Sequence, residues 1–342
     1  MKQVLITQKG EPREALRVVE TEIPEPTAGQ VRVQVLASGI GFADVMMRRG
    51  LYIDTPKMPF TPGYDICGIV DKHGSGTSEF RLGQRVAALT VYNGNAQYIC
   101  LDEKSLVPVP QGLDPAEVTS IVLNYTSAYQ MLHRIARVKP GAKILIHGAA
   151  GGVGTAFLQL GKVAGLHMYG TASRAKHPLI EQLGATPIDY REEDFVKRIL
   201  TLTGDGVDAV FDPIGGAHLR QSFKTLRKGG RLVAYGLSSV VTHGGNLAVT
   251  FIGQSIEMWW WSLLPNSKKA SFYDIGKGGI MTQHPEWIQE DLATLLTLLA
   301  EGKIKPVIAE RLSLGQVAYA HEQLETSQVE GKIVLLPNEH LM

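Results

Sequence analysis

Residues 143–154 read KILIHGAAGGVG, and this segment sets the architecture of the chain. Its apolar beginning passes directly into glycines, and residues 155–162 (TAFLQLGK) then place apolar side chains at helical spacing. This order predicts a buried strand, a tight turn and a helix. Glycines let the backbone approach a pyrophosphate, whose charge is met by free amide N–H groups and by the positive end of the helix dipole. The segment therefore predicts a dinucleotide-binding turn, although glycine-rich loops also serve as plain turns.

Further apolar runs follow this segment at regular intervals and alternate with helical patterns. They occupy residues 166–171, 185–188, 207–211 and 231–235. Strands that alternate with helices form a parallel sheet, because each crossover helix returns the chain to the same edge. We therefore expect an α/β fold with a doubly wound parallel sheet, and the glycine turn lies at the carboxyl edge of that sheet.

The composition is that of an ordinary globular chain. Its 342 residues are 44% hydrophobic and 20% charged, which is long enough for two domains with separate cores. The net charge is +1 and no run of Lys or Arg is present. Nucleic acid or an acidic membrane surface would need concentrated positive charge, so a small molecule is the expected ligand.

The first residues and the cysteines indicate the cellular compartment in which the protein is expected. The first residues lack the long apolar segment of a signal peptide, so a cytoplasmic location is expected. Cys67 and Cys100 are the only cysteines. Two are too few for a disulfide framework or a four-thiolate zinc site, and we expect both to be reduced and buried.

The regions outside the predicted parallel sheet have a different pattern. Residues 31–35 (VRVQV) alternate strictly between apolar and polar side chains, which predicts a half-buried antiparallel strand. Short strands and turn residues continue to about residue 120 and predict a mostly β unit. Asp114 and Pro115 then open a helix that leads into the dinucleotide domain. The C-terminal region predicts strands at 312–314 and 332–336 around a helix at 316–326.

Nine short motifs, taken in their order and spacing, resemble the medium-chain dehydrogenase/reductase superfamily. The resemblance is to its zinc-independent quinone oxidoreductase branch, and within that branch to the vesicle amine transport protein homologues. The motifs are GIGFAD (39–44), RGLY (49–52), TPG (61–63), NYTSAY (124–129), GAAGGVG (148–154), GTASRAKH (170–177), IDY (188–190), DPIGG (212–216) and GKIVL (331–335).

The resemblance implies a Rossmann NADP-binding domain inserted into a mostly β, GroES-like catalytic domain. The nucleotide domain would span residues 122–276, and the discontinuous catalytic domain residues 1–121 and 277–342. A quinone or enone substrate would lie in the cleft between them, and the molecule would be a homodimer.

Zinc alcohol dehydrogenases of this superfamily carry a cysteine three residues before the Asp, a Gly-His-Glu motif and a cluster of four cysteines. The matching residues here are Gly41, Tyr64 and Asp65, and the chain has no cysteine cluster. A site of soft or borderline ligands cannot be assembled from these residues. We therefore expect no metal. Related reductases often have an Asn that touches the cofactor where Gly41 stands, so that contact is lost here.

Without a Lewis acid, the reaction suits an acceptor that takes hydride readily, such as a quinone or an α,β-unsaturated carbonyl. Tyr52, in the RGLY motif, is the first candidate for a catalytic hydroxyl, although it could instead pack the domain edge. Tyr64 could line the pocket or simply fill the space that zinc would occupy. Asp44 is expected to fix the local backbone rather than to transfer protons.

The cofactor candidates come from several parts of the chain. Residues of the glycine turn would approach the pyrophosphate. The resemblance places Asn124 and Ser127 on the nicotinamide side, and Lys332 lies in the GKIVL motif of the C-terminal strand. For Asn124, Tyr125 and Ser127, capping and packing of a helix is an equally good interpretation. Gly236 and Leu237 end a sheet strand at the carboxyl edge, where ligands bind. The set is Asn124, Ser127, Ala150, Gly151, Gly152, Val153, Gly236, Leu237 and Lys332.

The residues after the second strand predict NADPH rather than NADH. NAD-preferring folds place an acid there to bond the ribose 2′-hydroxyl. This chain has Ser173 and no acid, and Arg174 and Lys176 follow at once. Ser173 and Lys176 are therefore expected to bind the 2′-phosphate, with Tyr190 beside the adenosine; Arg174 could as easily point into water.

Three other features of the sequence lie outside these motifs. Ser222 and His218 are expected to be surface polar residues on a helix. Residues 247–264 approach the length of a membrane span, but Gln254 and Glu257 in their middle favour a helix over the cleft or a dimer seam. Residues 268–275 predict the last sheet strand, through which two subunits would pair, with Trp259–Trp261 shielded from solvent.

Two functions compete on this basis. The first is a zinc-independent, NADPH-dependent reductase of quinones or α,β-unsaturated carbonyls. The alternative is a non-catalytic protein that retains NADPH for structure, as lens crystallins and vesicle proteins of the superfamily suggest. Turnover with a quinone or enone separates the two.

Overall fold

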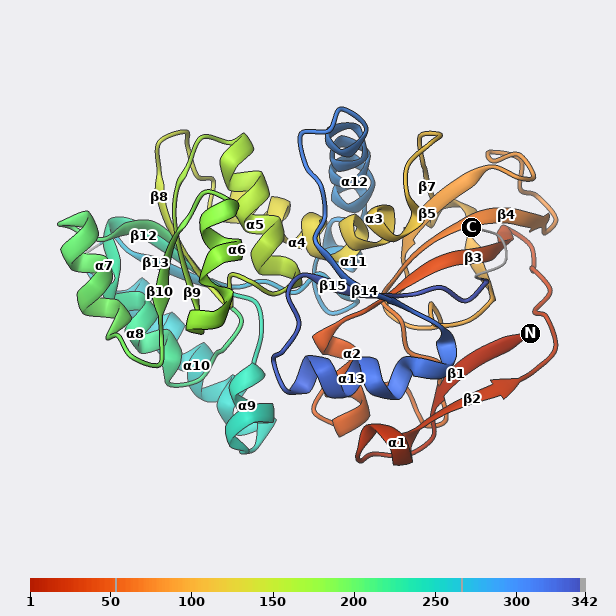
Figure 1. Ribbon diagram of the computed structural model, residues 1–342, viewed down its shortest axis with the longest axis horizontal. Helices are drawn as coiled ribbons and strands as arrows, with labels where there is room; N and C mark the ends of the chain where they lie inside the picture. Colours follow the sequence, from red (N-terminus) through yellow and green to blue (C-terminus); the bar gives the residue numbers. More distant parts are fainter. Residues whose placement is uncertain (53, 266, 339–342) are drawn as a thin grey trace. The chain divides into compact units, whose positions relative to one another are not determined.

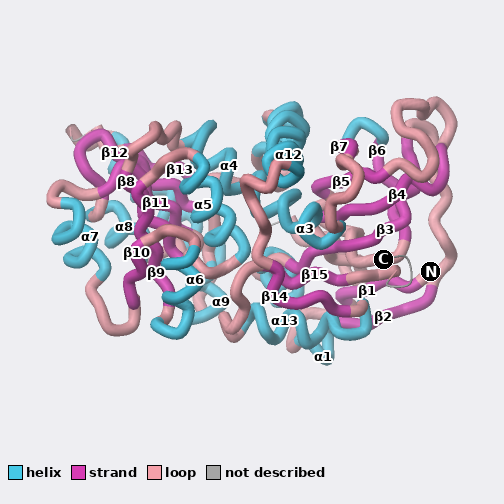
Figure 2. The backbone as a smooth tube through the Cα atoms, turned by 45° about the horizontal axis from the view of Figure 1, so that its top comes forward, coloured by secondary structure: helices cyan, strands magenta, loops and turns pink. Residues whose placement is uncertain are grey.

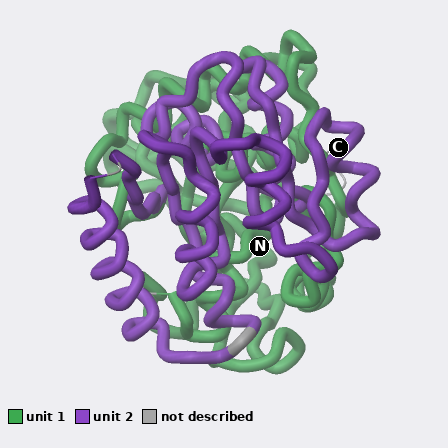
Figure 3. The backbone as a smooth tube through the Cα atoms, turned by 90° about the vertical axis from the view of Figure 1, so that its left-hand side faces the viewer, with its two compact units in different colours: residues 1–126, 276–342 green, residues 127–275 purple. Residues whose placement is uncertain are grey.

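The computed structural model describes residues 1–338 except 53 and 266 (Figure 1). The chain divides into two compact units, which Figure 3 shows in different colours. The first comprises Met1–Thr126 and Gly276–Met342, and the second Ser127–Ile275. The fold is α/β, with a mostly β first unit and a parallel sheet in the second, as the sequence predicts.

The first unit is built on a seven-stranded sheet with the order β14-β15-β3-β4-β5-β7, in which β6 also pairs with β3. Strand β3 pairs antiparallel with β4, β6 and β15, and only β14 and β15 run parallel. Two further strands form a small antiparallel sheet. The strands are β1 (Lys2–Ile6), β2 (Leu16–Glu20), β3 (Gln30–Ile40), β4 (Asp65–His73), β5 (Arg85–Leu89), β6 (Tyr98–Asp102), β7 (Val107–Pro108), β14 (Ile308–Leu312) and β15 (Lys332–Leu335).

The core of this sheet follows the alternation of β3. Val31, Val33 and Val35 are fully buried, while Arg32 and Gln34 between them are partly exposed. The prediction of a half-buried antiparallel strand is confirmed, because only the face with valines packs into the core. The helices are α1 (Pro12–Ala15), α2 (Phe42–Arg49), α3 (Pro115–Ser120), α11 (Ile280–Gln283), α12 (Pro285–Ala300) and α13 (Val317–Glu325).

Two expectations for this unit need correction. The strand expected at 312–314 ends at Leu312, because Ser313 forms a capping box with Gln316 and begins a 3₁₀ turn, Leu314–Gln316. Cys67 is buried as expected, and burial raises the pKa of its thiol to about 12. Cys100 is only partly buried, because it lies opposite Arg32 of β3, on the face of the sheet that does not pack into the valine core.

The second unit contains an all-parallel sheet of six strands in the order β10-β9-β8-β11-β12-β13. The chain starts at β8, moves to one edge through β9 and β10, and then crosses to β11 on the other side of β8. This is a doubly wound sheet with its switch point between β8 and β11. The strands are β8 (Lys143–His147), β9 (His167–Ala172), β10 (Thr186–Asp189), β11 (Val207–Asp212), β12 (Leu226–Ala234) and β13 (Lys269–Phe272).

Helices flank both faces of this sheet (Figure 2). One face packs a cluster that includes Leu145, Val210 and Leu232 from the strands with Phe195 and Leu219 from helices. On the other face the Phe157 ring stacks on Phe211, with ring centroids 4.3 Å apart. Helix α4 (Thr126–Tyr129) precedes β8, and the helices that follow β8 are α5 (Gly152–Val163), α6 (His177–Gln182), α7 (Phe195–Thr203), α8 (His218–Lys224), α9 (Ser238–His243) and α10 (Leu247–Ser262).

Helix α10 is the apolar helix predicted at 247–264. Among the described residues, no helix is long and apolar enough to cross a membrane. Trp261 stacks on Phe223, whereas Trp259 and Trp260 have exposed fractions of 60% and 59% in the single chain. Shielding of all three tryptophans would therefore require a partner that covers the helix, and it stays a prediction.

Candidate functional site

The glycine turn lies between β8 and α5, as predicted. Gly148 has a φ of +63°, which a residue with a side chain rarely adopts, and the helix begins at Gly152. A Cβ atom on Gly154 would lie 2.3 Å from the carbonyl oxygen of Gly148, so only glycine fits where the helix crosses the turn. The first N–H groups of a helix have no acceptor within it. Gly152 and Val153 are the first residues of the helix and are partly exposed, so their backbone N–H groups can bind an anion.

The residues predicted to bind the 2′-phosphate leave the sheet at the same edge. Ala172 at the end of β9 pairs with Asp189 at the end of β10, so Ser173 and Tyr190 follow neighbouring strand ends. The Ser173 carbonyl accepts a hydrogen bond of 2.9 Å from the backbone N–H of Lys176, which closes a turn between these two residues.

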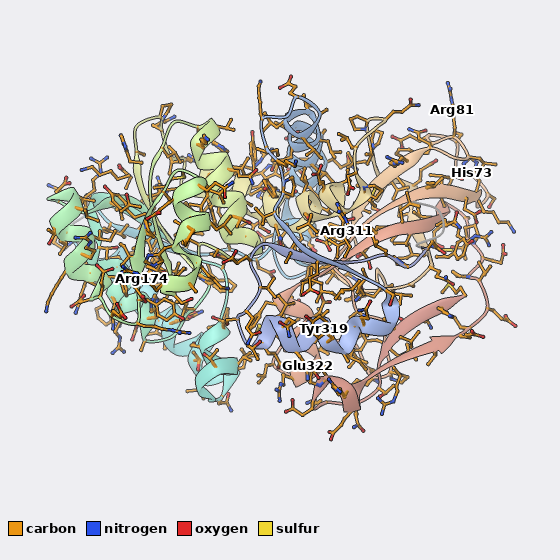
Figure 4. The ribbon with its side chains drawn as sticks, viewed as in Figure 1. His73, Arg81, Arg174, Arg311, Tyr319 and Glu322 are labelled. Carbon is orange, nitrogen blue, oxygen red and sulfur yellow. The ribbon has the colours of Figure 1, made fainter. Side chains whose placement is uncertain are left out.

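The side chains at this edge have suitable exposure for a ligand. Ser173 and Lys176 are partly exposed, and Tyr190 has an exposed fraction of 51%. Arg174, labelled in Figure 4, is exposed, so either interpretation of it remains open. The structure thus brings these residues to one edge, and their contact with a cofactor stays a prediction.

The ends of β11 and β12 form the other half of this edge. The N–H of Tyr235 donates to the carbonyl of Asp212 over 2.9 Å. A Cβ atom on Gly236 would lie 2.5 Å from the carbonyl oxygen of Pro213, so glycine is required for this close backbone approach. Leu237 is buried just before α9. Gly236 and Leu237 therefore lie at the carboxyl edge of the sheet.

A buried polar network stands behind this edge, and it corrects the expectation for Ser222 and His218. Ser222 is completely buried, and its hydroxyl donates to Oδ2 of Asp212 over 2.6 Å. His218 is mostly buried, and its Nδ1 lies 2.8 Å from the same carboxylate oxygen. Nε2 of His147 is 3.1 Å from the Ser222 hydroxyl, and its Nδ1 is 2.9 Å from that of Thr171.

The sequence did not reveal this network, because a helical pattern alone does not show which polar residues face inward. One signal was present: His147 and Asp212 directly follow the apolar runs 144–146 and 209–211 of their strands, and such polar residues need partners. Burial lowers the pKa of His147 to about 3, so it is neutral at pH 7. Burial opposes ionisation of Asp212, but its hydrogen bond from His218 and the other groups of the network hold its pKa below the usual range.

In the first unit, the hydroxyls of Tyr52 and Tyr64 are in hydrogen-bond contact, with their rings edge to face and the centroids 6.4 Å apart. Tyr64 is buried, with an exposed fraction of 2%, and Tyr52 is partly exposed. The two candidate tyrosines therefore form a pair. Tyr64 fills space in the core and also touches the more accessible hydroxyl.

The Asp44 side chain fixes the local backbone, as expected. Its carboxylate accepts the N–H groups of Gly41 over 2.8 Å and Gly63 over 3.0 Å. Burial raises the pKa of Asp44 to about 6, although both N–H groups and the charge of Lys332 lower it. This carboxylate orders the two segments that would carry metal ligands in the zinc relatives.

Lys332 is buried in the first unit, where its Nζ lies 2.7 Å from Oδ2 of Asp65. A role in cofactor binding stays a prediction for this residue. The ion pair itself was not predicted, although a lysine within the apolar motif GKIVL signals a buried counter-charge. The alkyl chain of Lys332 and the Asp65 carboxylate also explain why residue 39 is a glycine, because a Cβ atom at this position would lie 2.2 Å from each of them.

Asn124 and Ser127 lie in one continuous helical segment and are both buried, with exposed fractions of 5%. The segment contains two π-helical stretches, Ile121–Tyr125 and Gln130–Ile135, and such wide turns are frequent at functional sites. Burial raises the pKa of the Tyr125 phenol. Both interpretations of Asn124 and Ser127 remain open.

The residues present do not fit a zinc ion at the position used by the zinc relatives. Gly41 offers no side chain, and the Tyr64 hydroxyl is already bonded to Tyr52. Within the described part of the chain, one group of three potential ligands lies close enough to hold a metal: His147, Asp212 and His218. Their nitrogen and oxygen atoms lie within 4.8 Å of one another, but all three groups are engaged by hydrogen bonds.

Comparison with known proteins places this geometry in context. Residues 27–111 match the alcohol dehydrogenase GroES-like domain, and residues 183–335 match the family described as zinc-binding dehydrogenase. The synaptic vesicle membrane protein VAT-1 homolog of Rattus norvegicus is 32% identical over 92% of this chain and 78% of its own length. The quinone oxidoreductase of the same species is 30% identical over 98% of both chains. The crystal structure of Escherichia coli quinone oxidoreductase complexed with NADPH superposes with a TM-score of 0.85, at 28% identity, over 98% of this chain and 100% of that one.

Proposed function

Since the chain belongs to the medium-chain dehydrogenase/reductase superfamily, with the VAT-1 homologues and quinone oxidoreductases among its relatives, we propose that it is a zinc-independent, NADPH-dependent reductase of quinones or α,β-unsaturated carbonyls. The observation that carries this proposal is the carboxyl edge of the parallel sheet. It combines a glycine turn at a helix N-terminus with Ser173 and Lys176, where NAD-binding folds have an acid.

The binding of NADPH would follow from charge and backbone geometry. The N–H groups of Gly152 and Val153 would meet the pyrophosphate, together with the turn residues Ala150 and Gly151. Ser173 would donate to the 2′-phosphate and Lys176 would supply a positive charge. Tyr190 would flank the adenosine. The crystal structure of Escherichia coli quinone oxidoreductase complexed with NADPH supports the choice of this cofactor.

The chemistry suits an acceptor that needs no metal. NADPH supplies a hydride, and reduction of a quinone by one hydride and one proton gives a hydroquinone and NADP⁺. The proton must reach an oxygen on which negative charge develops. Tyr52 is our candidate donor, and Tyr64 orients its hydroxyl. The positions of Gly41 and Tyr64, which lack zinc-ligating groups, support zinc independence.

The test is the rate of NADPH oxidation against a panel of quinones, enones and enoyl thioesters, with and without exhaustive chelation. We expect turnover of at least one class, unchanged by the chelator. Stoichiometric zinc in the purified protein, with activity lost on its removal and restored on its return, would refute zinc independence.

A second candidate function is a non-catalytic, NADPH-binding scaffold. The exposed apolar side chains of α10 favour it, because a partner could bind there. The names of the VAT-1 relatives also associate them with vesicle membranes. Binding of NADPH without turnover of any acceptor in the panel would favour this candidate.

A further inference from the structure

The buried network in the second unit has a defined hydrogen-bond direction. An ionised carboxylate can only accept, so the Ser222 hydroxyl donates its proton to Asp212. The Ser222 oxygen then accepts from Nε2–H of His147, and Nδ1 of His147 accepts from the Thr171 hydroxyl. His218 donates from Nδ1 to Asp212. Each group is satisfied, and the network ends on one carboxylate.

That carboxylate also holds a loop through its other oxygen. Oδ1 of Asp212 accepts the backbone N–H groups of Ile214 over 2.7 Å and Gly215 over 3.1 Å. Gly215 and Gly216 have φ values of +74° and +58°, so this loop depends on external hydrogen bonds to keep one conformation. His218 and Ser222 therefore fix Oδ2, and Oδ1 fixes the loop.

The loop in turn forms part of the carboxyl edge. A Cβ atom on Gly215 would lie 2.8 Å from the carbonyl oxygen of Gly236, and one on Gly236 would lie 2.5 Å from that of Pro213. The two backbone segments are thus in direct contact. A displacement of loop 213–216 would therefore move the backbone at Gly236, just after β12.

The position of the loop in the sheet indicates which half of a dinucleotide it would serve. The two mononucleotide halves of a dinucleotide lie on opposite sides of the switch point of a doubly wound sheet. Ser173 and Tyr190 follow β9 and β10, on one side. Asp212 ends β11 and Gly236 comes shortly after β12, on the other side. The adenosine half belongs to the first pair, so the nicotinamide half belongs to the second.

We propose that Asp212 is a positioning residue for the nicotinamide half of the cofactor, and that His218 and Ser222 hold it in place. This inference rests on the proposed function, because it assumes that NADPH binds at the carboxyl edge. The network reaches the strand before Ser173 only through the Thr171 hydroxyl, whereas Asp212, His218 and Ser222 lie together on β11 and α8. It should therefore influence binding of the whole dinucleotide but not binding of a fragment that lacks nicotinamide.

The experiment compares two ligands, NADPH and 2′,5′-ADP, by titration calorimetry on the full chain. His218→Ala removes the donor to Asp212, and His218→Asn keeps an amide donor near the position of Nδ1. His167→Gln is the matched control, because His167 is exposed at the amino end of β9. Melting temperatures establish that each variant is folded.

We expect His218→Ala to weaken NADPH by about 5- to 20-fold, consistent with the loss of one charge-assisted hydrogen bond, and 2′,5′-ADP by less than about twofold. His218→Asn should recover most of the NADPH affinity, and His167→Gln should bind both ligands like the wild type. Ser222→Ala should show the same selectivity as His218→Ala.

Two outcomes would overturn the inference while the proposed function stands. One is wild-type affinity for NADPH in both His218→Ala and Ser222→Ala. The other is an equal loss for the two ligands, which would mean that the network stabilises the whole unit rather than one end of the site. A wild-type protein that binds neither ligand would instead overturn the proposed function and the inference together.

Discussion

Nζ of Lys332 lies 2.7 Å from Oδ2 of Asp65, and both side chains are buried within the first unit. These residues come from β15 and β4, at opposite ends of the sequence. The pair therefore ties the C-terminal strand to the N-terminal part of the sheet. Removing one partner leaves a buried charge without compensation, which costs more than the pair itself contributes.

We accordingly expect Lys332→Met to lower the free energy of unfolding by about 3–5 kcal/mol. The double variant Asp65→Leu/Lys332→Met should recover most of that loss, since it buries no charge. Urea unfolding measures both values. Lys303→Met is the control, because its partner Glu301 is exposed and such pairs contribute less than about 1 kcal/mol. A single variant as stable as this control would contradict the prediction.

Asp44 should make stability depend on pH in the opposite sense to an ordinary surface carboxylate. Its pKa of about 6 in the folded protein is above the usual value, because burial outweighs the N–H groups of Gly41 and Gly63. Between the two pKa values the folded chain binds more protons than the unfolded chain, so the contribution of Asp44 to stability falls as pH rises toward 6 and is fully present only below about pH 4.

The shift corresponds to roughly 3 kcal/mol. The stability of Asp44→Asn relative to the wild type should therefore improve by up to about that amount between pH 4 and pH 7.5, whatever constant cost the substitution carries. Urea unfolding at several pH values tests this difference. A difference between variant and wild type that does not change with pH would show that Asp44 is not the titrating group.

Tyr52→Phe should lower kcat by about 100-fold while leaving the dissociation constant for NADPH unchanged, if its hydroxyl supplies the proton. Tyr64→Phe should have a smaller effect, since it removes only the group that orients Tyr52. Tyr319→Phe, at the exposed position labelled in Figure 4, is the control. Full activity in Tyr52→Phe would leave packing as the role of this tyrosine.

The parts of the fold that the sequence predicted are those that local pattern determines. The glycine turn at 148–154 is such a case, because φ at Gly148 and the close contact at Gly154 exclude other residues. The alternation of Val31, Val33 and Val35 is another, because a strand with one buried face requires it.

The parts that were missed depend on partners distant in the sequence. Ser222 was expected at the surface, and its burial follows from Asp212 and His147, which end two different strands. Lys332 and Asp65 are paired only because β15 joins the sheet that contains β4. A sequence shows that a buried polar residue needs a partner, but only the topology identifies that partner.

The edge of the parallel sheet predicts a homodimer. Among the residues that the structure describes, β13 is the last strand of the sheet and its outer side has no partner strand, and Phe272 on this strand packs edge to face on Phe251 of α10. Ile256 and Trp260 of the same helix are exposed. A second copy that pairs along β13 would cover the strand edge, and it would shield the adjoining apolar helix.

Light scattering should give the mass of a dimer for the wild type, and Trp260→Glu should shift it toward the monomer. Gln221→Glu, at an exposed position of α8, adds the same charge and should have no effect. A monodisperse wild-type monomer would contradict the prediction. So would partition of the protein onto lipid vesicles, which would mean that the apolar helix binds a membrane instead.

The choice between NADPH and NADH should depend on Ser173 and Lys176. β9 ends at Ala172 without an acid to bond the ribose 2′-hydroxyl or to repel a phosphate. A charge-assisted hydrogen bond is worth roughly 1.5–3 kcal/mol, so Lys176→Ala should weaken NADPH by about 10- to 100-fold and leave NADH almost unchanged. Ser173→Asp should move the preference further toward NADH, because the new carboxylate repels the 2′-phosphate. The measurement is kcat/KM for both cofactors in the wild type and the two variants, with Arg174→Ala to determine whether that exposed guanidinium contributes. Equal wild-type efficiencies, or equal losses with both cofactors, would show that the turn after β9 does not recognise the phosphate.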